Sequence, residues 1–90
     1  MHSLLERFIE HELSAHVQAT ISSFVQEARL DSHVALREVG GNEISVTLDF
    51  SRNLALLEDV LVPGKAGELQ LPLTAFLAAV GVTANPPGSA

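Results

Sequence analysis

The segment EISVTLDF at residues 43–50 constrains the fold more than any other part of the sequence. Its four apolar residues alternate with polar ones, which is the period-two pattern of a strand with one apolar and one polar face. The preceding Gly-Gly-Asn tolerates the positive φ angles of a tight turn. These features predict a β-hairpin over residues 33–50, and its apolar face requires a cover from other elements.

The register of this hairpin follows from keeping its apolar residues on one face. Leu36 joins that face if it lies opposite Val46 across a three-residue loop at 40–42, because a one-residue slip would reverse one strand. The same register places His33 opposite Asp49 on the polar face. We interpret that pair as an exposed ion pair rather than a general base with its orienting acid, because the sequence places no nucleophile beside it.

Residues 3–30 contain no Gly or Pro, and their apolar residues recur every three or four positions, which predicts helix. The main apolar stripe runs from Leu13 to Ala28. A second group, here called the N-terminal patch, lies on a different side of the helix and comprises Leu4, Leu5, Phe8 and Ile9. Three interpretations are open: the helix breaks near residues 10–14 with Ser14 as a new cap, it curves and buries both sides in its own core, or the patch contacts another molecule.

The second half of the chain contains weaker signals. The segment LALLEDVLV does not alternate, so we expect a short helix over residues 52–62 that ends at Pro-Gly. The segment ELQL at 68–71 allows a short third strand. Pro72 suits the first turn of a last helix, and Gly81 is its stop signal.

These elements predict an α+β fold: a long N-terminal helix packed on a β-hairpin, with an optional third strand and two short C-terminal helices, in the order α-β-β-α-(β)-α. We expect residues 1–82 to form a single domain and residues 83–90 to form a flexible tail. The expected core consists of Leu13, Val17, Ile21, Phe24, Val34, Leu36, Ile44, Val46, Leu48, Phe50, Leu54, Leu57, Leu61, Leu69, Leu71, Phe76, Leu77 and Val80.

The segment HELSAH at residues 11–16 resembles a zinc-protease helix in composition only. Such a helix needs histidines four residues apart, because that spacing lets both converge on one ion. Here the spacing is five, which turns His11 and His16 away from each other on a regular helix. A metal-dependent enzyme that uses His11, Glu12 and His16 is therefore the least favoured interpretation, and we expect no cofactor, no metal and no catalytic residue.

Charge limits the partners. The chain has 11 acidic and 5 basic residues, a net charge of −6, and its basic residues are scattered. Such a chain repels the phosphates of nucleic acids and anionic membrane surfaces, and no apolar run reaches the roughly 18–20 residues that span a bilayer. The absence of cysteine fits a reducing cytoplasm.

We therefore expect a non-catalytic, acidic protein-binding module, such as an adaptor, chaperone or inhibitor, in the cytoplasm. The N-terminal patch is its expected contact, either in a two-fold homodimer or with a more basic protein. A structural subunit that assembles with itself is the alternative.

Overall fold

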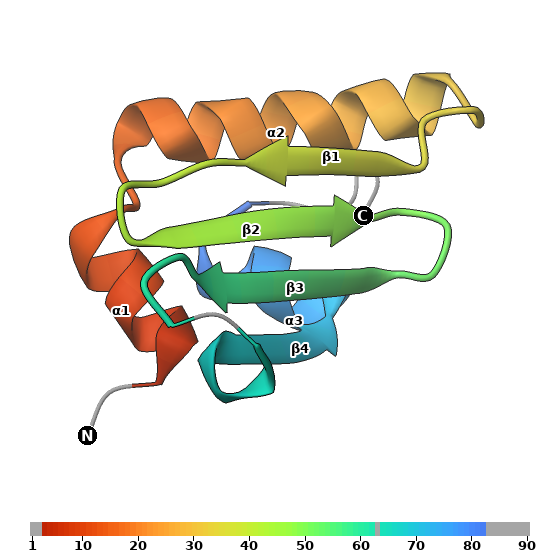
Figure 1. The fold of residues 1–90 in the computed structure, drawn as a ribbon. Helices are drawn as coiled ribbons and strands as arrows, with labels where there is room; N and C mark the ends of the chain where they lie inside the picture. Colours follow the sequence, from red (N-terminus) through yellow and green to blue (C-terminus); the bar gives the residue numbers. More distant parts are fainter. Residues whose placement is uncertain (1–2, 63, 83–90) are drawn as a thin grey trace.

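The structure is a computed structural model, and it describes residues 3–62 and 64–82. Along the chain, the elements are α1 (Leu4–His11), α2 (Ala15–Leu30), β1 (Leu36–Val39), β2 (Ile44–Asp49), β3 (Leu54–Asp59), the short 3-10 helix η1 (Lys65–Gly67), β4 (Glu68–Pro72) and α3 (Leu73–Ala79) (Figure 1). The predicted α+β class is confirmed.

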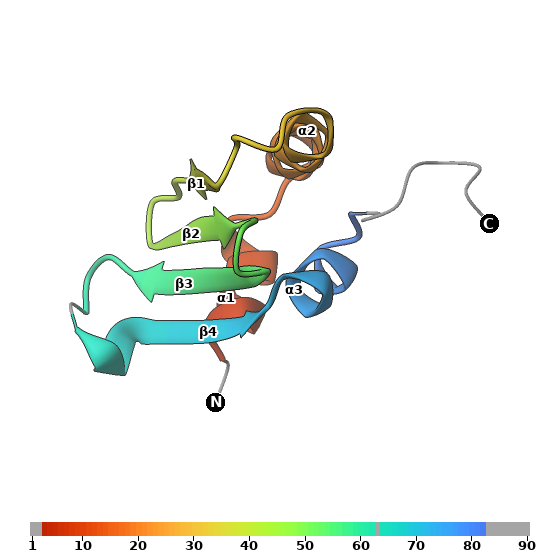
Figure 2. The same cartoon turned by 90° about the vertical axis from the view of Figure 1, so that its right-hand side faces the viewer.

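The four strands form one antiparallel sheet in the order β1-β2-β3-β4, so each strand pairs with its neighbour in sequence. The helices lie on one side of this sheet, as the view turned by 90° shows (Figure 2). Strand β2 explains the arrangement, because its residues are alternately buried and partly exposed. One face of the sheet is therefore covered by helices, and none of the helices in residues 3–62 and 64–82 covers the other face.

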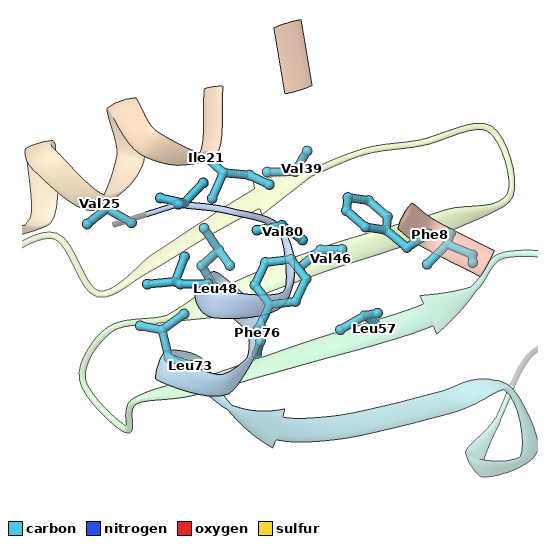
Figure 3. Close-up of a cluster of buried hydrophobic side chains, with 14 residues drawn as sticks. Phe8, Ile21, Val25, Val39, Val46, Leu48, Leu57, Leu73, Phe76 and Val80 are labelled. Carbon is cyan, nitrogen blue, oxygen red and sulfur yellow. The ribbon is translucent and has the colours of Figure 1, made fainter. Parts of the chain in front are cut away.

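The core lies between the sheet and the helices (Figure 3). Phe8 of α1 and Phe76 of α3 are both almost fully buried, and their ring centroids are 5.9 Å apart. Ile21 and Val25 bring α2 against the same cluster. All three helices thus share one core with β2 and β3.

The N-terminal helical segment breaks, as one of the three interpretations predicted. Ser3 and Glu6 form a capping box at the start of α1. Ser14 caps α2, with its hydroxyl accepting a hydrogen bond from the Val17 N–H at 3.1 Å. The break gives α1 and α2 different directions, so both can pack on the sheet.

The helix predicted over residues 52–62 is wrong, because most of that segment is strand β3. A strand in the middle of a sheet has neighbours on both sides, and the first four residues of β3 are apolar on both faces. Ala55 and Leu57 are buried under the helices, whereas Leu54 and Leu56 are partly exposed on the opposite face. Leu61, predicted in the core, follows the strand and is 74% exposed.

The predicted hairpin register is also wrong. Leu36 pairs with Asp49, and Val46 pairs with Val39 instead of Leu36. Val39 is buried, whereas Leu36 is 55% exposed on the uncovered face. The last pair before the turn is Val39 with Val46, which leaves six residues between the paired positions instead of the predicted three, so each β1 residue pairs three positions further along β2.

The C-terminal predictions agree with the structure. The optional strand forms as β4, and α3 follows directly from Pro72. Gly81 has φ 75°, the left-handed conformation expected after a helix. The predicted tail at 83–90 lies outside the described residues.

The prediction of the core is correct in part. The predicted core residues that are buried are Ile21, Ile44, Val46, Leu48, Leu57, Phe76, Leu77 and Val80. The buried hydrophobic residues that the prediction missed are Phe8, Val25, Val39, Ala55, Leu73 and Val82.

Candidate binding face on the uncovered side of the sheet

The side of the sheet that faces away from the helices is covered by no other element of the described residues (Figure 2). Side chains alternate along each strand, so pairing assigns each residue to a face. The strand residues that face away from the helices, here called the open face, are Leu36, Glu38, Ser45, Thr47, Asp49, Leu54, Leu56, Glu58, Glu68, Gln70 and Pro72.

The open face is acidic and partly apolar. Four of its eleven residues are acidic, four are Leu or Pro, and none is Lys or Arg. The only basic strand residue, Arg37, lies on the helix side, where its Nε donates to Glu27 Oε1 of α2 at 2.6 Å. The charge of this face therefore has no compensation from the strands themselves.

Glu58 and Glu68 are the most unusual pair on this face. They are direct partners across β3 and β4, so two carboxylates project from adjacent positions on the same side. Like charges directly opposite each other in an antiparallel pair destabilise a sheet. A positively charged group from another molecule would relieve this repulsion.

Asp49 has a structural role at one end of the open face. Its Oδ1 accepts hydrogen bonds from the Arg52 N–H and the Ser51 hydroxyl, each at 3.0 Å. Burial raises the pKa of Asp49, but these hydrogen bonds and the Arg52 charge outweigh it and lower the pKa below its ordinary value. This carboxylate therefore stabilises the turn between β2 and β3.

Glu12, the acid within HELSAH, stabilises the other hairpin turn. It lies in the break between α1 and α2, and its carboxylate accepts the backbone N–H groups of Asn42, Glu43 and Ile44 at 3.1, 2.6 and 2.9 Å. Burial raises the pKa of Glu12, but the three backbone hydrogen bonds together outweigh it and lower the pKa. The close approach requires Gly41, where an added Cβ would lie 2.7 Å from the Glu12 carboxylate.

A pocket of about 370 Å³ lies beside this carboxylate, and His11, Glu12, Gly40 and Asn42 are among its lining residues. Within residues 3–62 and 64–82, no group of three or more His, Cys, Asp or Glu side chains could hold a metal ion. His16 does not line the pocket. The described residues thus do not bring His11, Glu12 and His16 together, and Glu12 stabilises the β1–β2 turn.

The other predicted pair is not assembled either. His33 precedes β1, is 95% exposed, and its Nδ1 lies 3.2 Å from Asp31 Oδ1. Asp49 pairs with Leu36 instead. The prediction that His33 lies opposite Asp49 is therefore wrong.

The N-terminal patch lies against the protein's own core. Phe8 is 1% exposed, and Leu4, Leu5 and Ile9 are partly buried against the core cluster. Helix α1 contacts both β3 and β4. The core of the same chain thus covers part of the N-terminal patch, and the contact of this patch with a second molecule stays a prediction.

Comparison with protein-family models, with curated proteins and with solved structures found no match for this chain. None of the helices in the described part of the chain is both long and apolar enough to cross a bilayer.

The open face could not be predicted from the sequence. The apolar residues of the β3 segment do not alternate, so that segment was predicted as a helix. Glu58 and Glu68 become neighbours only when β3 and β4 pair.

Proposed function

We propose that this protein is a non-catalytic, acidic protein-binding module that receives a more basic protein on the open face of its sheet. The observation that carries the proposal is the uncovered face, with Glu58 and Glu68 directly opposed and no basic strand residue beside them. Retaining a repulsive pair costs stability in the free protein. A partner that supplies Lys or Arg side chains offsets that cost on binding.

The composition of the face indicates the chemistry of the partner. Leu54 and Leu56 are partly exposed in β3, where Leu54 lies beside Asp49 of β2 and the next residue on the same face after Leu56 is Glu58. A complementary surface therefore combines apolar side chains with Lys or Arg at its rim. A second copy of this chain does not fit here, because it would place acids against acids.

The test compares two charge reversals of equal size. Glu58→Lys changes the open face, and Glu10→Lys changes an exposed position on α1. Glu58→Lys also turns a repulsive cross-strand pair into an attractive one, so lost binding would not result from a weakened sheet. The partner is isolated by cross-linking in the source cells and then titrated as a purified protein.

We expect the isolated partner to be basic, to bind more weakly at high salt, and to lose about tenfold or more in affinity with Glu58→Lys. Glu10→Lys should bind like the parent protein. An acidic partner, or equal binding by both variants, would contradict the proposal.

A further inference from the structure

The two edges of the sheet differ in how their outward backbone groups are occupied. At β1, the Phe50 N–H donates to the Ala35 carbonyl at 2.8 Å, which fixes the alternation of hydrogen-bonded pairs along the hairpin. By that alternation Leu36 and Glu38 direct their backbone groups away from β2. The Leu36 carbonyl already accepts Arg37 Nη1 at 2.8 Å, so a side chain protects this edge.

The β4 edge has no such side-chain protection among the described residues. The Leu73 N–H donates to the Asn53 carbonyl at 2.9 Å, so Leu69 and Leu71 direct their backbone groups toward β3. Gln70 therefore directs its N–H and carbonyl outward. Pro72 lies on the same outward-directed set of residues as Gln70. This position suits a proline, because proline has no N–H to donate to β3.

We propose that β4 pairs with β4 of a second copy of this chain, antiparallel and centred on Gln70. Outward N–H and carbonyl groups on one residue form two hydrogen bonds with the same residue of a two-fold partner. The β1 edge suits such pairing less well, because Arg37 occupies the outward Leu36 carbonyl and pairing centred on Glu38 would place two acids directly opposite each other. The two-fold axis thus passes between Gln70 and the partner's Gln70.

The side chains of β4 fit this register. Leu69 would lie opposite the partner's Leu71 on the helix side, and both residues are only partly buried in the single chain. On the open face, Glu68 would lie opposite the partner's Pro72, so no two acids face each other across the junction. The strand is therefore self-complementary in both polarity and charge.

This pairing extends the sheet without covering the open face. An axis perpendicular to the sheet keeps the helices of both copies on the same side, so the dimer would have eight strands and two adjoining acidic faces. Helix α1 packs on β3 and β4, so the two copies of α1 would also lie near the junction. The N-terminal patch would then adjoin the dimer contact while remaining part of each core.

Proline substitutions at matched edge positions test the proposal. Gln70→Pro removes an outward N–H without breaking the β3–β4 ladder, and Glu38→Pro does the same on β1. Sedimentation equilibrium of the parent chain should show a dimer, and Gln70→Pro should raise its dissociation constant by about tenfold or more, since both hydrogen bonds at the axis are lost. Glu38→Pro should dimerise like the parent.

A cross-link provides a second readout that does not depend on how well the proline variant folds. The chain has no cysteine, so Gln70→Cys carries a single thiol. Cα atoms of a hydrogen-bonded antiparallel pair are about 5.5 Å apart, within the range that a disulfide spans. Gln70→Cys should therefore oxidise to a covalent dimer, whereas Glu38→Cys should not.

Three results would overturn the proposal: a parent chain that is monomeric at high micromolar concentration, a folded Gln70→Pro variant that still dimerises, or no difference in cross-linking between the two cysteine variants. None of these depends on the basic partner of the open face, so the two proposals fail separately.

Discussion

Glu12, Asp49 and Asp59 each accept backbone hydrogen bonds in the segments between helices and strands. Asp59 is 7% exposed, its Oδ1 accepts the Leu61 N–H at 2.9 Å, and its Oδ2 lies 3.0 Å from Arg7 Nη1 of α1. The Leu61 hydrogen bond, more than the Arg7 charge, lowers the pKa of Asp59, and partial burial opposes both. These acids stabilise the fold, so they differ in role from Glu58 and Glu68 of the open face.

The first prediction concerns Glu12. Because its pKa is lower in the folded chain than its ordinary value of 4.5, its ionised form stabilises the fold above that pH, and this contribution is lost as the pH falls through the folded pKa. We expect Glu12→Gln to lower the free energy of unfolding by about 1–2 kcal/mol at neutral pH. Urea titrations should show that the free energies of unfolding of the parent and of Glu12→Gln become more similar as the pH is lowered. If the two free energies differ by the same amount at every pH, the charge of Glu12 has no role in stability.

The second prediction concerns the opposed acids. Glu68→Gln should raise the free energy of unfolding by about 0.2–1 kcal/mol, because it removes the repulsion from Glu58 across the strands. Glu38→Gln is the control, since Glu38 lies opposite Thr47 rather than an acid. Equal effects of the two substitutions in urea titrations would mean that only net charge matters.

At the scale of elements, the β1–β2 turn depends on the close approach of the helix break. Gly41 has no room for a side chain, since an added Cβ would lie 2.5 Å from the Ile44 carbonyl oxygen, whereas Gly40 has no atom within 4 Å. We expect Gly41→Ala to destabilise the protein by about 1–3 kcal/mol. Gly40→Ala should be neutral or slightly stabilising. A lower melting temperature for Gly40→Ala than for Gly41→Ala would contradict this description of the turn.

Helix α1 gives the fourth prediction. Phe8→Ala should cost about 3–5 kcal/mol, because it removes a buried ring that contacts Phe76. Leu61→Ala should change stability by less than about 0.5 kcal/mol, since that side chain is 74% exposed. If Phe8→Ala melts like the parent, then α1 is not part of the core.

The sequence predicted elements best where one face of an element is apolar. The alternation of β2, the cap at Ser14 and the Pro72 start of α3 were all visible, because each depends on local chemistry. Strand β3 was not, because a continuous apolar run of this length fits a buried helix as well as a central strand. That single error hid the open face, since two of its Leu side chains belong to β3.

The hairpin register failed for a related reason. The predicted register requires Leu36 on the apolar face, whereas the structure places it on the open face. Burial of Val39 decides the actual register. The role of Glu12 could not be predicted, because its three hydrogen-bond donors lie about thirty residues further along the chain.

At the scale of the whole molecule, a small acidic chain has a sheet with helices on one side only. The buried face supplies the stability, and the open face combines acids with partly exposed leucines. An uncovered face of this composition in a chain of net charge −6 favours a basic protein over a nucleic acid or an anionic surface. Pairing through β4 would double the face without changing it.

The most direct test of this account is a methyl NMR titration with a peptide of alternating lysine and leucine, which complements the open face in charge and polarity. Leu54 and Leu56 report on that face, and Leu30, which is 88% exposed at the end of α2, reports on the rest of the surface. We expect the methyl signals of Leu54 and Leu56 to shift, that of Leu30 to remain in place, and a peptide of alternating glutamate and leucine to have no effect. Shifts at Leu30 that equal or exceed those at Leu54 and Leu56 would contradict the assignment of the open face as the binding surface.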